Sequence, residues 1–327
     1  MEKVRTPIFF IEYEKKDITA YITPFVLSVS YTDYEHGESD EIEIQLEDRE
    51  HLWKSSWYPN KGDVITLRIG YEGEGLLPCG AFEIDEIEFT APPDIVILKG
   101  LATNIKKSLR QKNTKAYENK TLKQIAEEIA KKHGFELVGE IENIRIKRIT
   151  QKQERDLAFL KRLAEEYGYI FKITDNKLVF YKESKLLEAG TIFVIDRKDM
   201  LSFQFRDKTY ELYKACEVSY HDPKTKKLIK HIVNADNVVK GDILKLNVRC
   251  ENKQQAIIKA KEALRQKNKM QTEGKIEVIG EPRLVAGSNI EIKGLHILDG
   301  KYHIKVARHK IDRARGYTTE LEVIKVV

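Results

Sequence analysis

Three histidines near the carboxyl end of the sequence are the first residues whose type suits chemistry, because imidazole nitrogens bind metal ions. In the segment KYHIKVARH, alternation places His303 and His309 on one face of a strand, with Tyr302 and Ile304 on the other. At the usual rise of a strand, the six residues from one histidine to the other span roughly 20 Å. We therefore expect His296, His303 and His309 on a solvated or interface face rather than in a zinc site.

Acidic side chains are the second candidates, because paired carboxylates can perform acid-base catalysis. They alternate with isoleucine in SDEIEIQLED and in EIDEIE. Such alternation is typical of a strand that has one polar face and one core face. Glu41, Glu43 and Glu47 are thus expected to point outward, and they are our candidates for a channel or interface face.

Other signatures of catalysis are missing from the sequence. It contains no G-x-S-x-G, phosphate loop, H-E-x-x-H or G-x-G-x-x-G motif. The glycines of YEGEG lie between two predicted strands, whereas a phosphate loop needs a helix N-terminus after it. Cys79, Cys216 and Cys250 are far apart and odd in number, which indicates buried free thiols. We expect no catalytic residue, no metal and no cofactor, and a protein that is not an enzyme.

The composition indicates a folded chain with a well-solvated surface. Charged residues make up 33% of the 327 residues and hydrophobic residues 41%. The 57 basic and 52 acidic residues give a net charge of +5, which is too even for strong electrostatic capture of nucleic acid. The opening MEKVRTPIFFIEYEKK has only a short apolar patch. We expect neither a signal peptide nor a membrane span there, and folding in a cytoplasm.

Residues 1–105 are expected to form a first β-barrel domain, because apolar residues recur there with a period of two between turn signals. Short strands at even spacing are typical of a closed barrel or a sandwich. The segment EDREHLWKSSW is expected to add one short helix. The predicted strands are PIFFIEY, DITAYI, PFVLSVSY, DEIEIQLED, GDVITLRIGY, GAFEIDEIEF and DIVILKGLA.

Residues 106–190 are expected to form a small α/β insertion module. The segment KTLKQIAEEIAKKHG has apolar residues at helical spacing, with Thr121 as the predicted N-cap and Gly134 as the stop. A second stripe, in ERDLAFLKRLAEEYG, ends at Gly168. Each helix runs into an aromatic strand, so the module resembles a duplicated helix-to-strand unit. Asp175 and Asn176 are expected to turn the chain between YIFKI and KLVFY.

Residues 191–327 are expected to form a second β-barrel domain that includes one long helix. The helix is predicted in NKQQAIIKAKEALRQKNKM, with Ile257, Ala260 and Leu264 on its apolar side and its lysines in water. Asp299 and Gly300 give the strongest hairpin signal in the chain. The basic segment HDPKTKKLIKH is expected to be a solvated hairpin tip. The predicted fold class is α+β, mainly β, in the order barrel, α/β module, barrel.

Three stretches of the sequence, taken in order, carry a resemblance to a known family. They are GDVITLRIGY followed by CGAFEIDEIEF and Pro92-Pro93; ERDLAFLKRLAEEYGYIFKITDNKLVFY; and GEPRLVAGSNIEIKGLHILDGKYHIKVARHKIDRARGYTTELEV. Together with the helix QAIIKAKEAL they extend over nearly the whole chain. In this order and spacing, the sequence resembles the phage late control protein D family, the hub proteins of contractile tail baseplates. The hub-like N-terminal part of type VI secretion spike proteins is similar.

The resemblance implies two tail-tube-like β-barrel domains on either side of the α/β module. It implies a homotrimer whose six barrels form a pseudo-sixfold ring, an adaptor between the hexameric tail tube and the trimeric central spike. The implied partners are the tail tube protein, the central spike protein, other baseplate proteins, and DNA that passes through the channel without specific binding. The implied location is the virion, in the tail baseplate of a phage, prophage or related contractile injection system, after assembly in the bacterial host cytoplasm.

Two other classes of function stay open. One is a tail-associated protein that binds or hydrolyses peptidoglycan. The T-L-x-x-I-A pattern at 121–126 resembles the first helix of LysM modules, and hydrolysis would need a carboxylate with a raised pKa. The other is a DNA-binding regulator, because the helix at 121–133 has the cadence of a helix-turn-helix protein, although no second recognition helix follows it. The chain ends at Val327, directly after the second predicted barrel, so it resembles a separate hub rather than a fused spike.

Overall fold

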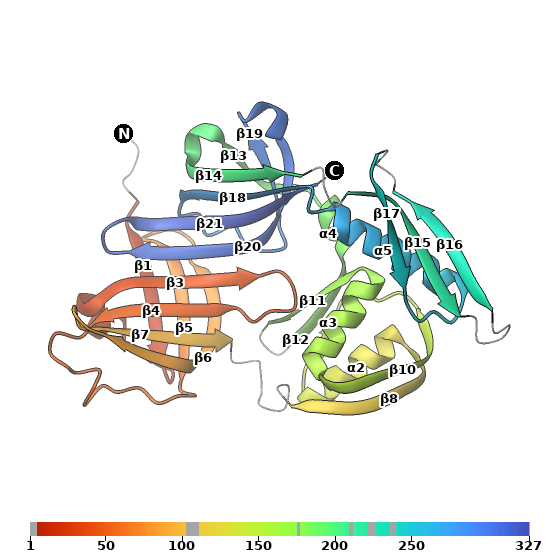
Figure 1. Ribbon diagram of the computed structural model, residues 1–327. Helices are drawn as coiled ribbons and strands as arrows, with labels where there is room; N and C mark the ends of the chain where they lie inside the picture. Colours follow the sequence, from red (N-terminus) through yellow and green to blue (C-terminus); the bar gives the residue numbers. More distant parts are fainter. Residues whose placement is uncertain are drawn as a thin grey trace.

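The computed structural model describes residues 5–102, 111–174, 177–208, 212–221, 227–235, 238 and 240–326. Within this part of the chain, buried apolar side chains gather in four clusters. Two clusters belong to the two halves of one large sheet, and two belong to smaller α/β units at its side (Figure 1). The fold is mainly β, as predicted. None of the described helices is long and apolar enough to cross a membrane.

The first half of the large sheet surrounds one apolar cluster. Its strands alternate between core and solvent because successive side chains point to opposite faces of a strand. In the strand that contains the three glutamates, Ile42, Ile44 and Leu46 are buried as predicted. The strands are β1 (Pro7–Tyr13), β2 (Lys16–Asp17), β3 (Val26–Tyr34), β4 (Glu41–Glu47), β5 (Val64–Tyr71), β6 (Leu77–Thr90) and β7 (Ile95–Ala102).

Two predictions for this half are wrong. The segment DITAYI contains a short helix, α1 (Thr19–Ile22), followed by a 3-10 turn, η1 (Thr23–Phe25), instead of a strand. Thr19 ties this segment to β1, because its Oγ1 accepts a hydrogen bond from the Ile11 backbone N–H at 2.9 Å. Residues 48–57, where a helix was expected, form only turns. His51 has a φ of 56°, which a right-handed helix cannot include.

The second half of the sheet continues the first through β20 (Gly300–Asp312), which pairs antiparallel with β3. The strand order is β14-β18-β21-β20-β3-β4-β7-β6-β5-β1-β2, and β19 joins β13 to β20. No sheet closes on itself among the described strands, so the predicted closed barrels are not confirmed. The remaining elements are β13 (Thr191–Asp196), η3 (Arg197–Asp199), β14 (Met200–Asp207), β18 (Thr272–Ile279), β19 (Asn289–Lys293) and β21 (Gly316–Lys325).

The pair Asp299-Gly300 does not form a two-residue hairpin turn, in contrast to the prediction. β19 ends at Lys293, so residues 294–299 connect it to β20 and include the 3-10 turn η4 (His296–Leu298). Asp299 Oδ1 accepts a hydrogen bond from the Leu295 N–H at 2.5 Å. The aspartate therefore closes a longer turn.

Both helices of the middle α/β unit end as predicted, and the first also begins as predicted. The Thr121 hydroxyl accepts from the Gln124 N–H at 3.1 Å, and the Gln124 side chain accepts from the Thr121 N–H at 2.9 Å. This reciprocal cap starts α2 (Leu122–His133). Gly134 and Gly168 adopt left-handed φ angles of 73° and 74°, which end α2 and α3 (Asp156–Tyr167).

The strands of the middle unit form two small sheets. β8 (Lys112–Thr121) pairs with β10 (Arg145–Arg155), and β12 (Lys177–Lys182) lies between β11 (Tyr169–Thr174) and β9 (Glu136–Val138). The short helix α4 (Glu183–Glu188) leads from β12 to the large sheet. The predicted turn at Asp175 and Asn176 lies outside the described residues.

A second α/β unit lies between β14 and β18 and is not predicted by the sequence pattern. β15 (Tyr213–His221) is flanked by β16 (Leu228–Asn234) and β17 (Asp242–Asn247), and this sheet packs on α5 (Lys253–Asn268). Residues 222–226 of the predicted basic tip lie outside the described residues. The predicted domain boundaries at 105 and 190 stay predictions.

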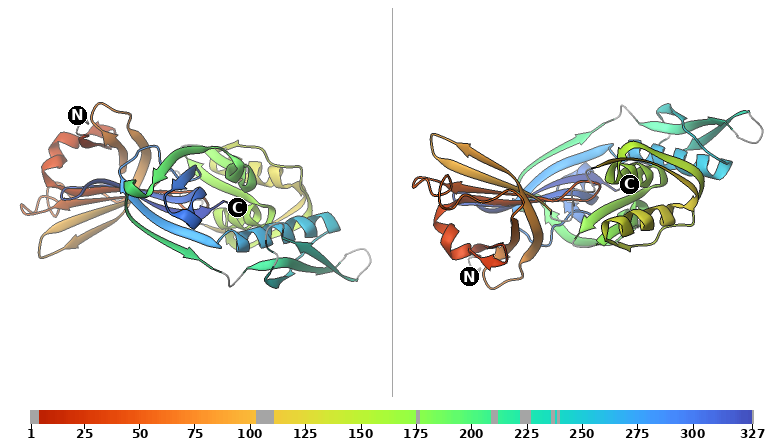
Figure 2. Two further views of the ribbon diagram at one scale, coloured as in Figure 1. Left: turned by 90° about the horizontal axis from the view of Figure 1, so that it is seen from above. Right: turned by 90° about the horizontal axis from the view of Figure 1, so that it is seen from below.

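The long helix has its predicted apolar side, but one of its lysines is not in water. Lys259 of α5 is buried, and its ammonium donates to Glu166 Oε2 of α3 at 2.7 Å. It also lies 5.2 Å from the centre of the Tyr167 ring. Figure 2 shows the resulting shape, in which the large sheet occupies one end of an elongated molecule and both α/β units the other.

Candidate functional site

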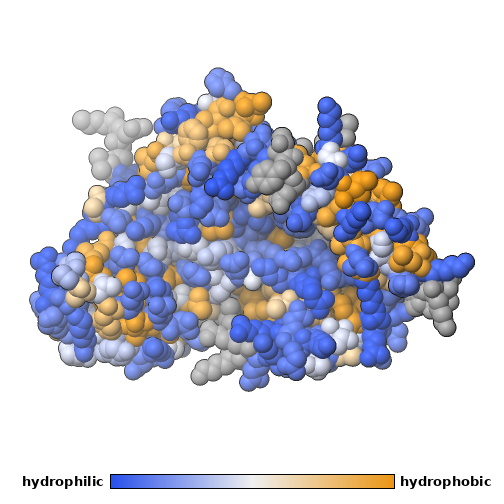
Figure 3. Space-filling model, in the orientation of Figure 1, coloured by the Kyte–Doolittle hydropathy of each residue, from blue (hydrophilic) through white to orange (hydrophobic). Residues whose placement is uncertain are grey.

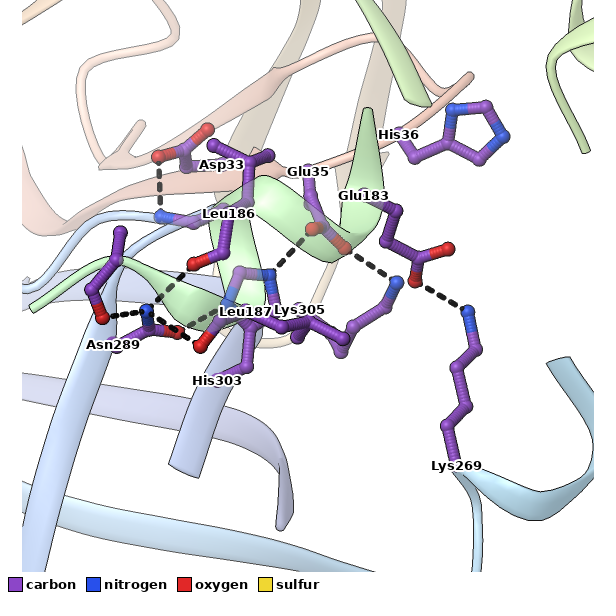
Figure 4. Close-up of polar contacts among 12 residues, drawn as sticks. Asp33, Glu35, His36, Glu183, Leu186, Leu187, Lys269, Asn289, His303 and Lys305 are labelled. Atoms are coloured by element: carbon purple, nitrogen blue, oxygen red, sulfur yellow. Dashed lines mark hydrogen bonds and ion pairs between the residues drawn. The ribbon is translucent and has the colours of Figure 1, made fainter. Parts of the chain in front are cut away.

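The sheet and the two α/β units meet at a buried network of charged and amide side chains (Figure 4). Its centre is Glu35, which directly follows β3, and His303 of β20. Both are buried, and His303 Nε2 lies 2.5 Å from Glu35 Oε1. The other carboxylate oxygen forms an ion pair with Lys305. We call this network the polar junction; it comprises Asp33, Glu35, Lys172, Glu183, Arg265, Lys269, Asn289, His303 and Lys305.

The charge of Glu35 is stabilised inside the protein by its two basic neighbours. Burial alone would raise the pKa of this carboxyl group. The hydrogen bond with His303 and the charge of Lys305 outweigh burial and lower the pKa. The pair therefore links the end of β3 to β20 by charge as well as by backbone pairing.

Asn289 joins β19 and β20 to α4. Its Oδ1 lies 2.6 Å from His303 Nδ1. Its Nδ2 donates to the backbone carbonyls of Leu186 and Ala189, at 2.7 and 2.8 Å. These carbonyls are at the end of α4, where a helix has no internal donors left for them. Asn289 thus satisfies groups that would otherwise be buried without partners.

Asp33 joins β3 to the middle unit. Lys172 of β11 forms ion pairs with Asp33 and with Asp40, the latter at 3.0 Å. Asp33 Oδ2 also accepts from the Ala286 backbone N–H at 2.9 Å. Burial alone would lower the pKa of Lys172, but the two carboxylates raise it. The ammonium therefore stays charged and holds β11 against the first half of the sheet.

Glu183, the first residue of α4, joins the middle unit to α5. Its side chain is 0% exposed, yet it accepts from Arg265 at 2.7 Å, Gln266 at 2.6 Å and Lys269 at 2.8 Å. Burial alone would raise its pKa, but the charges of Lys269 and Arg265 lower the pKa to about 2. An ionised carboxylate therefore clamps the two α/β units together.

A cavity of about 610 Å³ lies beside the polar junction, and it is the place where catalysis would be sought. The junction carboxylates that line it, Glu35 and Glu183, are already held by basic partners. His36 Nδ1 accepts from the Phe171 N–H at 3.0 Å, and burial lowers the pKa of His36. Among the described residues, no three His, Cys, Asp or Glu side chains are placed to hold a metal ion. The contacts of the junction suit a structural role.

The three cysteines are buried free thiols, as predicted. Burial raises the pKa of Cys79, Cys216 and Cys250, and that of Cys216 reaches about 11. Thiols in such surroundings are poor nucleophiles because the thiolate is the reactive form.

Glu41, Glu43 and Glu47 lie on the outward face of β4, as the alternation predicts. The face around them carries both signs of charge. Glu47 forms ion pairs with Arg49 at 2.7 Å and Arg313 at 3.9 Å. A groove of about 430 Å³ beside Glu41 and Glu43 is also lined by basic residues, namely Lys99, Arg308 and Lys310. Whether this face lines a channel stays a prediction.

Two of the three histidines are not on a solvated face, so that prediction is wrong for His303 and His309. Both are 0% exposed, whereas His296 is exposed. His309 contacts the Tyr317 hydroxyl at 2.8 Å, and burial lowers its pKa to about 4. A bulge between Ile304 and Val306 explains the error for His309, because the extra residue reverses which later positions of β20 point inward. His303 precedes the bulge and is buried by its contacts with Glu35 and Asn289.

Exposed apolar side chains gather on the outer face of three strands of the second half. Figure 3 shows apolar surface over β13 and β14. Such a patch on a protein surface marks a site of association. The large side chains in it are Ile192 and Val194 of β13, Leu201 and Phe203 of β14, and Ile279 of β18. We call these five residues the apolar face.

Comparison with known proteins gives the family of this chain. The family model described as phage tail baseplate hub (GPD) matches residues 107–314. The chain belongs to this family. The matched residues include both α/β units, the polar junction residues from Lys172 onward and most of the second half of the sheet.

Curated relatives of this hub family are similar over part of their length. The probable baseplate hub protein of Escherichia phage P2 is 31% identical over 187 residues, which are 57% of this chain and 48% of that protein. The probable baseplate hub protein of Escherichia phage 186 is 29% identical over 186 residues, 56% of this chain and 47% of that protein. The chain thus spans about half the length of the curated relatives it matches.

A solved structure shares the fold of this chain over almost its whole length. The 43 kDa tail protein of prophage MuSo2 from Shewanella oneidensis has a TM-score of 0.76, with 98% of each chain covered. The two sequences are 14% identical, so this likeness concerns the fold. It includes both halves of the sheet and both α/β units.

Proposed function

We propose that the chain is the hub of a contractile tail baseplate, a homotrimer that joins the hexameric tail tube to the trimeric central spike. The observation that supports this function is the fixed relative position of the two sheet halves and the two α/β units. The two halves pair along one sheet through β3 and β20, and the polar junction ties both to the α/β units. A protein that transmits force between a tube and a spike must hold its units in fixed relative positions.

Each half of the sheet is proposed to act as a tail-tube-like barrel. The first half runs β3-β4-β7-β6-β5-β1, and the second runs β14-β18-β21-β20-β19-β13. Each set of strands surrounds its own apolar cluster. Three copies would present six such units in a pseudo-sixfold ring, which suits a sixfold tube on one side and a threefold spike on the other.

The apolar face supports assembly into larger particles. A ring of copies needs an extensive surface of each subunit to be covered by neighbours. Among the described residues, Leu201 and Phe203 are 53% and 39% exposed. We assign the apolar face to contacts inside the baseplate, with a second copy or with another baseplate protein.

Mixing the purified chain with the tail tube protein and the central spike protein of the same particle tests the hub function. We expect one complex on a sizing column that contains all three proteins and three copies of the chain. The double variant L201D/F203D should form less of this complex, and L228D, on an exposed part of β16, serves as the matched control. A chain that binds neither tube nor spike would contradict the proposed function.

The outward face of β4 is proposed to line the channel through which DNA passes without specific binding. Like charge would keep DNA from adhering to Glu41, Glu43 and Glu47. Reversing all three to Lys should lower DNA delivery per particle. The same reversal at Glu50, Glu72 and Glu136, which are exposed elsewhere, is the control. Unchanged delivery by the first variant would exclude the channel role of this face.

The proposed role is structural, in the virion baseplate, after assembly in the host cytoplasm. The paired state of the junction carboxylates supports a protein without catalysis. Purified chain should therefore leave peptidoglycan intact on zymography. Clear bands of lysis would favour the alternative, a hydrolase carried by the tail.

A further inference from the structure

A strong local excess of positive charge lies on the two-stranded sheet of β8 and β10. These strands contain eight basic and two acidic residues, whereas the whole chain has a net charge of +5. They pair antiparallel from Arg145 opposite Thr121 to Arg155 opposite Lys112. We call these two paired strands the basic ribbon.

One side of the basic ribbon is fixed by the core of the middle unit. Tyr117 of β8 is buried, and its ring stacks on Phe159 of α3 at 5.3 Å between ring centres. Ile146 and Gln151 of β10 are also buried. Figure 1 shows the ribbon along the margin of the molecule, beside α2 and α3, which it contacts. The ribbon therefore has one free face on a packed support.

The free face carries basic side chains that have no counter-ion. Because successive side chains of a strand alternate, buried Ile146 places Arg145 and Lys147 outward. Buried Gln151 places Lys152 outward in the same way. Five exposed basic side chains of the ribbon form no ion pair with the described residues of the chain. These five free cations are Lys112, Arg145, Lys147, Lys152 and Arg155.

The other three basic residues of the ribbon are paired within the chain. Lys115 and Lys120 both form ion pairs with Glu128 of α2. Arg148 pairs with Glu118 of the neighbouring strand at 3.5 Å. The charge that is open to an outside partner therefore belongs to the five free cations.

Two further carboxylates lie close to the ribbon and are already bound. Glu154 pairs with Arg162 of α3 at 3.0 Å. Glu251 accepts from the backbone N–H groups of Lys147 and Arg148, at 2.8 and 3.0 Å. Glu251 offsets part of the positive charge at this end of the ribbon, and neither carboxylate forms an ion pair with a free cation in the described part of the chain.

The side chains of the free face indicate the chemistry of the partner. None of the ribbon residues, all of which the structure describes, is an exposed large apolar residue. The centre of a protein interface is apolar and aromatic, and a protein that lies on a membrane uses apolar anchors. Arginine, lysine and an exposed hydroxyl group, that of Thr150, suit phosphate oxygens instead. A partner with many phosphate groups is therefore favoured.

We propose that the basic ribbon binds the phosphate backbone of duplex DNA without reading its base sequence. The 11 residues of β10 extend over roughly 33 Å, which is close to one turn of a duplex. A duplex carries about one phosphate for every 1.7 Å of its axis, so each free cation has a phosphate within reach. Single-stranded nucleic acid is less suited, because its binding sites use exposed aromatic side chains for stacking.

This site goes beyond the proposed hub function and uses residues other than the β4 face that is proposed to line the channel. The near balance of 57 basic and 52 acidic residues indicates that the chain as a whole does not capture DNA strongly. The fold concentrates positive charge on one ribbon, where a weak contact that depends on salt concentration is expected.

Fluorescence anisotropy of a labelled duplex of about 20 base pairs, titrated with the full chain at about 50–200 mM KCl, tests the site. Five phosphate contacts predict a slope of about −4.5 when the logarithm of affinity is plotted against the logarithm of salt concentration. Two duplexes of unrelated sequence should bind equally, because phosphate contacts carry no sequence information.

The triple variant K112Q/K147Q/K152Q should bind DNA at least roughly tenfold more weakly at low salt, with a slope of about −2. K16Q/K61Q/K198Q removes the same charge from exposed positions elsewhere and should keep the wild-type slope. K112R/K147R/K152R keeps the charge of the ribbon and should bind DNA like wild type.

A ribbon variant with the wild-type slope, or a control variant that loses as much affinity, would overturn the DNA site. A clear preference for one of the two duplex sequences would also overturn it. Tighter binding to phosphatidylserine vesicles than to duplex, at equal phosphate concentration, would assign the ribbon to a membrane surface instead. The ribbon variant should still bind the tail tube and the central spike, so this test and the test of the hub function have separate outcomes.

Discussion

Glu183 shows how a single buried charge holds two units of the molecule together. It accepts hydrogen bonds from Arg265, Gln266 and Lys269, and it has no exposed surface. Removing one partner of a buried ion pair leaves the other charges uncompensated. Without Glu183, Lys269 would lose this carboxylate, whereas Arg265 would keep its ion pair with Glu262. The clamp between α4 and α5 therefore depends on Glu183.

E183Q is therefore expected to lower the free energy of unfolding at neutral pH by about 3–5 kcal/mol. The pKa of Glu183 is about 2 in the folded protein, below its ordinary value of 4.5. Its contribution to stability is complete above pH 4.5 and is lost as the pH falls toward 2. Urea unfolding of wild type and E183Q over this range should show the difference shrinking.

The exposed Glu188 of the same helix supplies the control. E188Q should unfold like wild type at every pH. A difference between wild type and E183Q that is equally large at pH 7 and near pH 2 would show that the charge of Glu183 is not what stabilises the clamp.

At the scale of elements, the sequence predicts the features that depend on a local residue pattern. It does not predict features that depend on contacts between residues far apart in the chain. The caps of α2 and the glycine stops after α2 and α3 follow from residue types within one turn of each helix end. The alternation in β4 likewise places Glu41, Glu43 and Glu47 outward. Such features involve only neighbours in sequence.

The bulge in β20 depends instead on the partners of the strand. Its extra residue buries His309 although simple alternation places it outside. The polar junction is also beyond reach of the sequence, since it joins Glu35 to His303 across 268 positions. One signal was present for His309, which alternates with apolar residues in a long strand, where a single bulge is enough to turn it inward.

At the scale of the whole molecule, one sheet contains both halves that the resemblance divides into separate barrels. The pairing of β3 with β20 and the buried charges beside it make the relative position of the halves part of the fold. The second α/β unit, inserted between β14 and β18, has no pattern that distinguishes its strands from those of the sheet around it. Strand content was therefore predictable, and the grouping of the strands was not.

Electron microscopy of the complex between chain, tail tube and central spike tests the central claim most directly. The hub function predicts a ring of three copies between tube and spike, with six half-sheets facing the end of the tube. A chain located on the outside of the baseplate, or a number of copies that does not match the threefold spike, would contradict it.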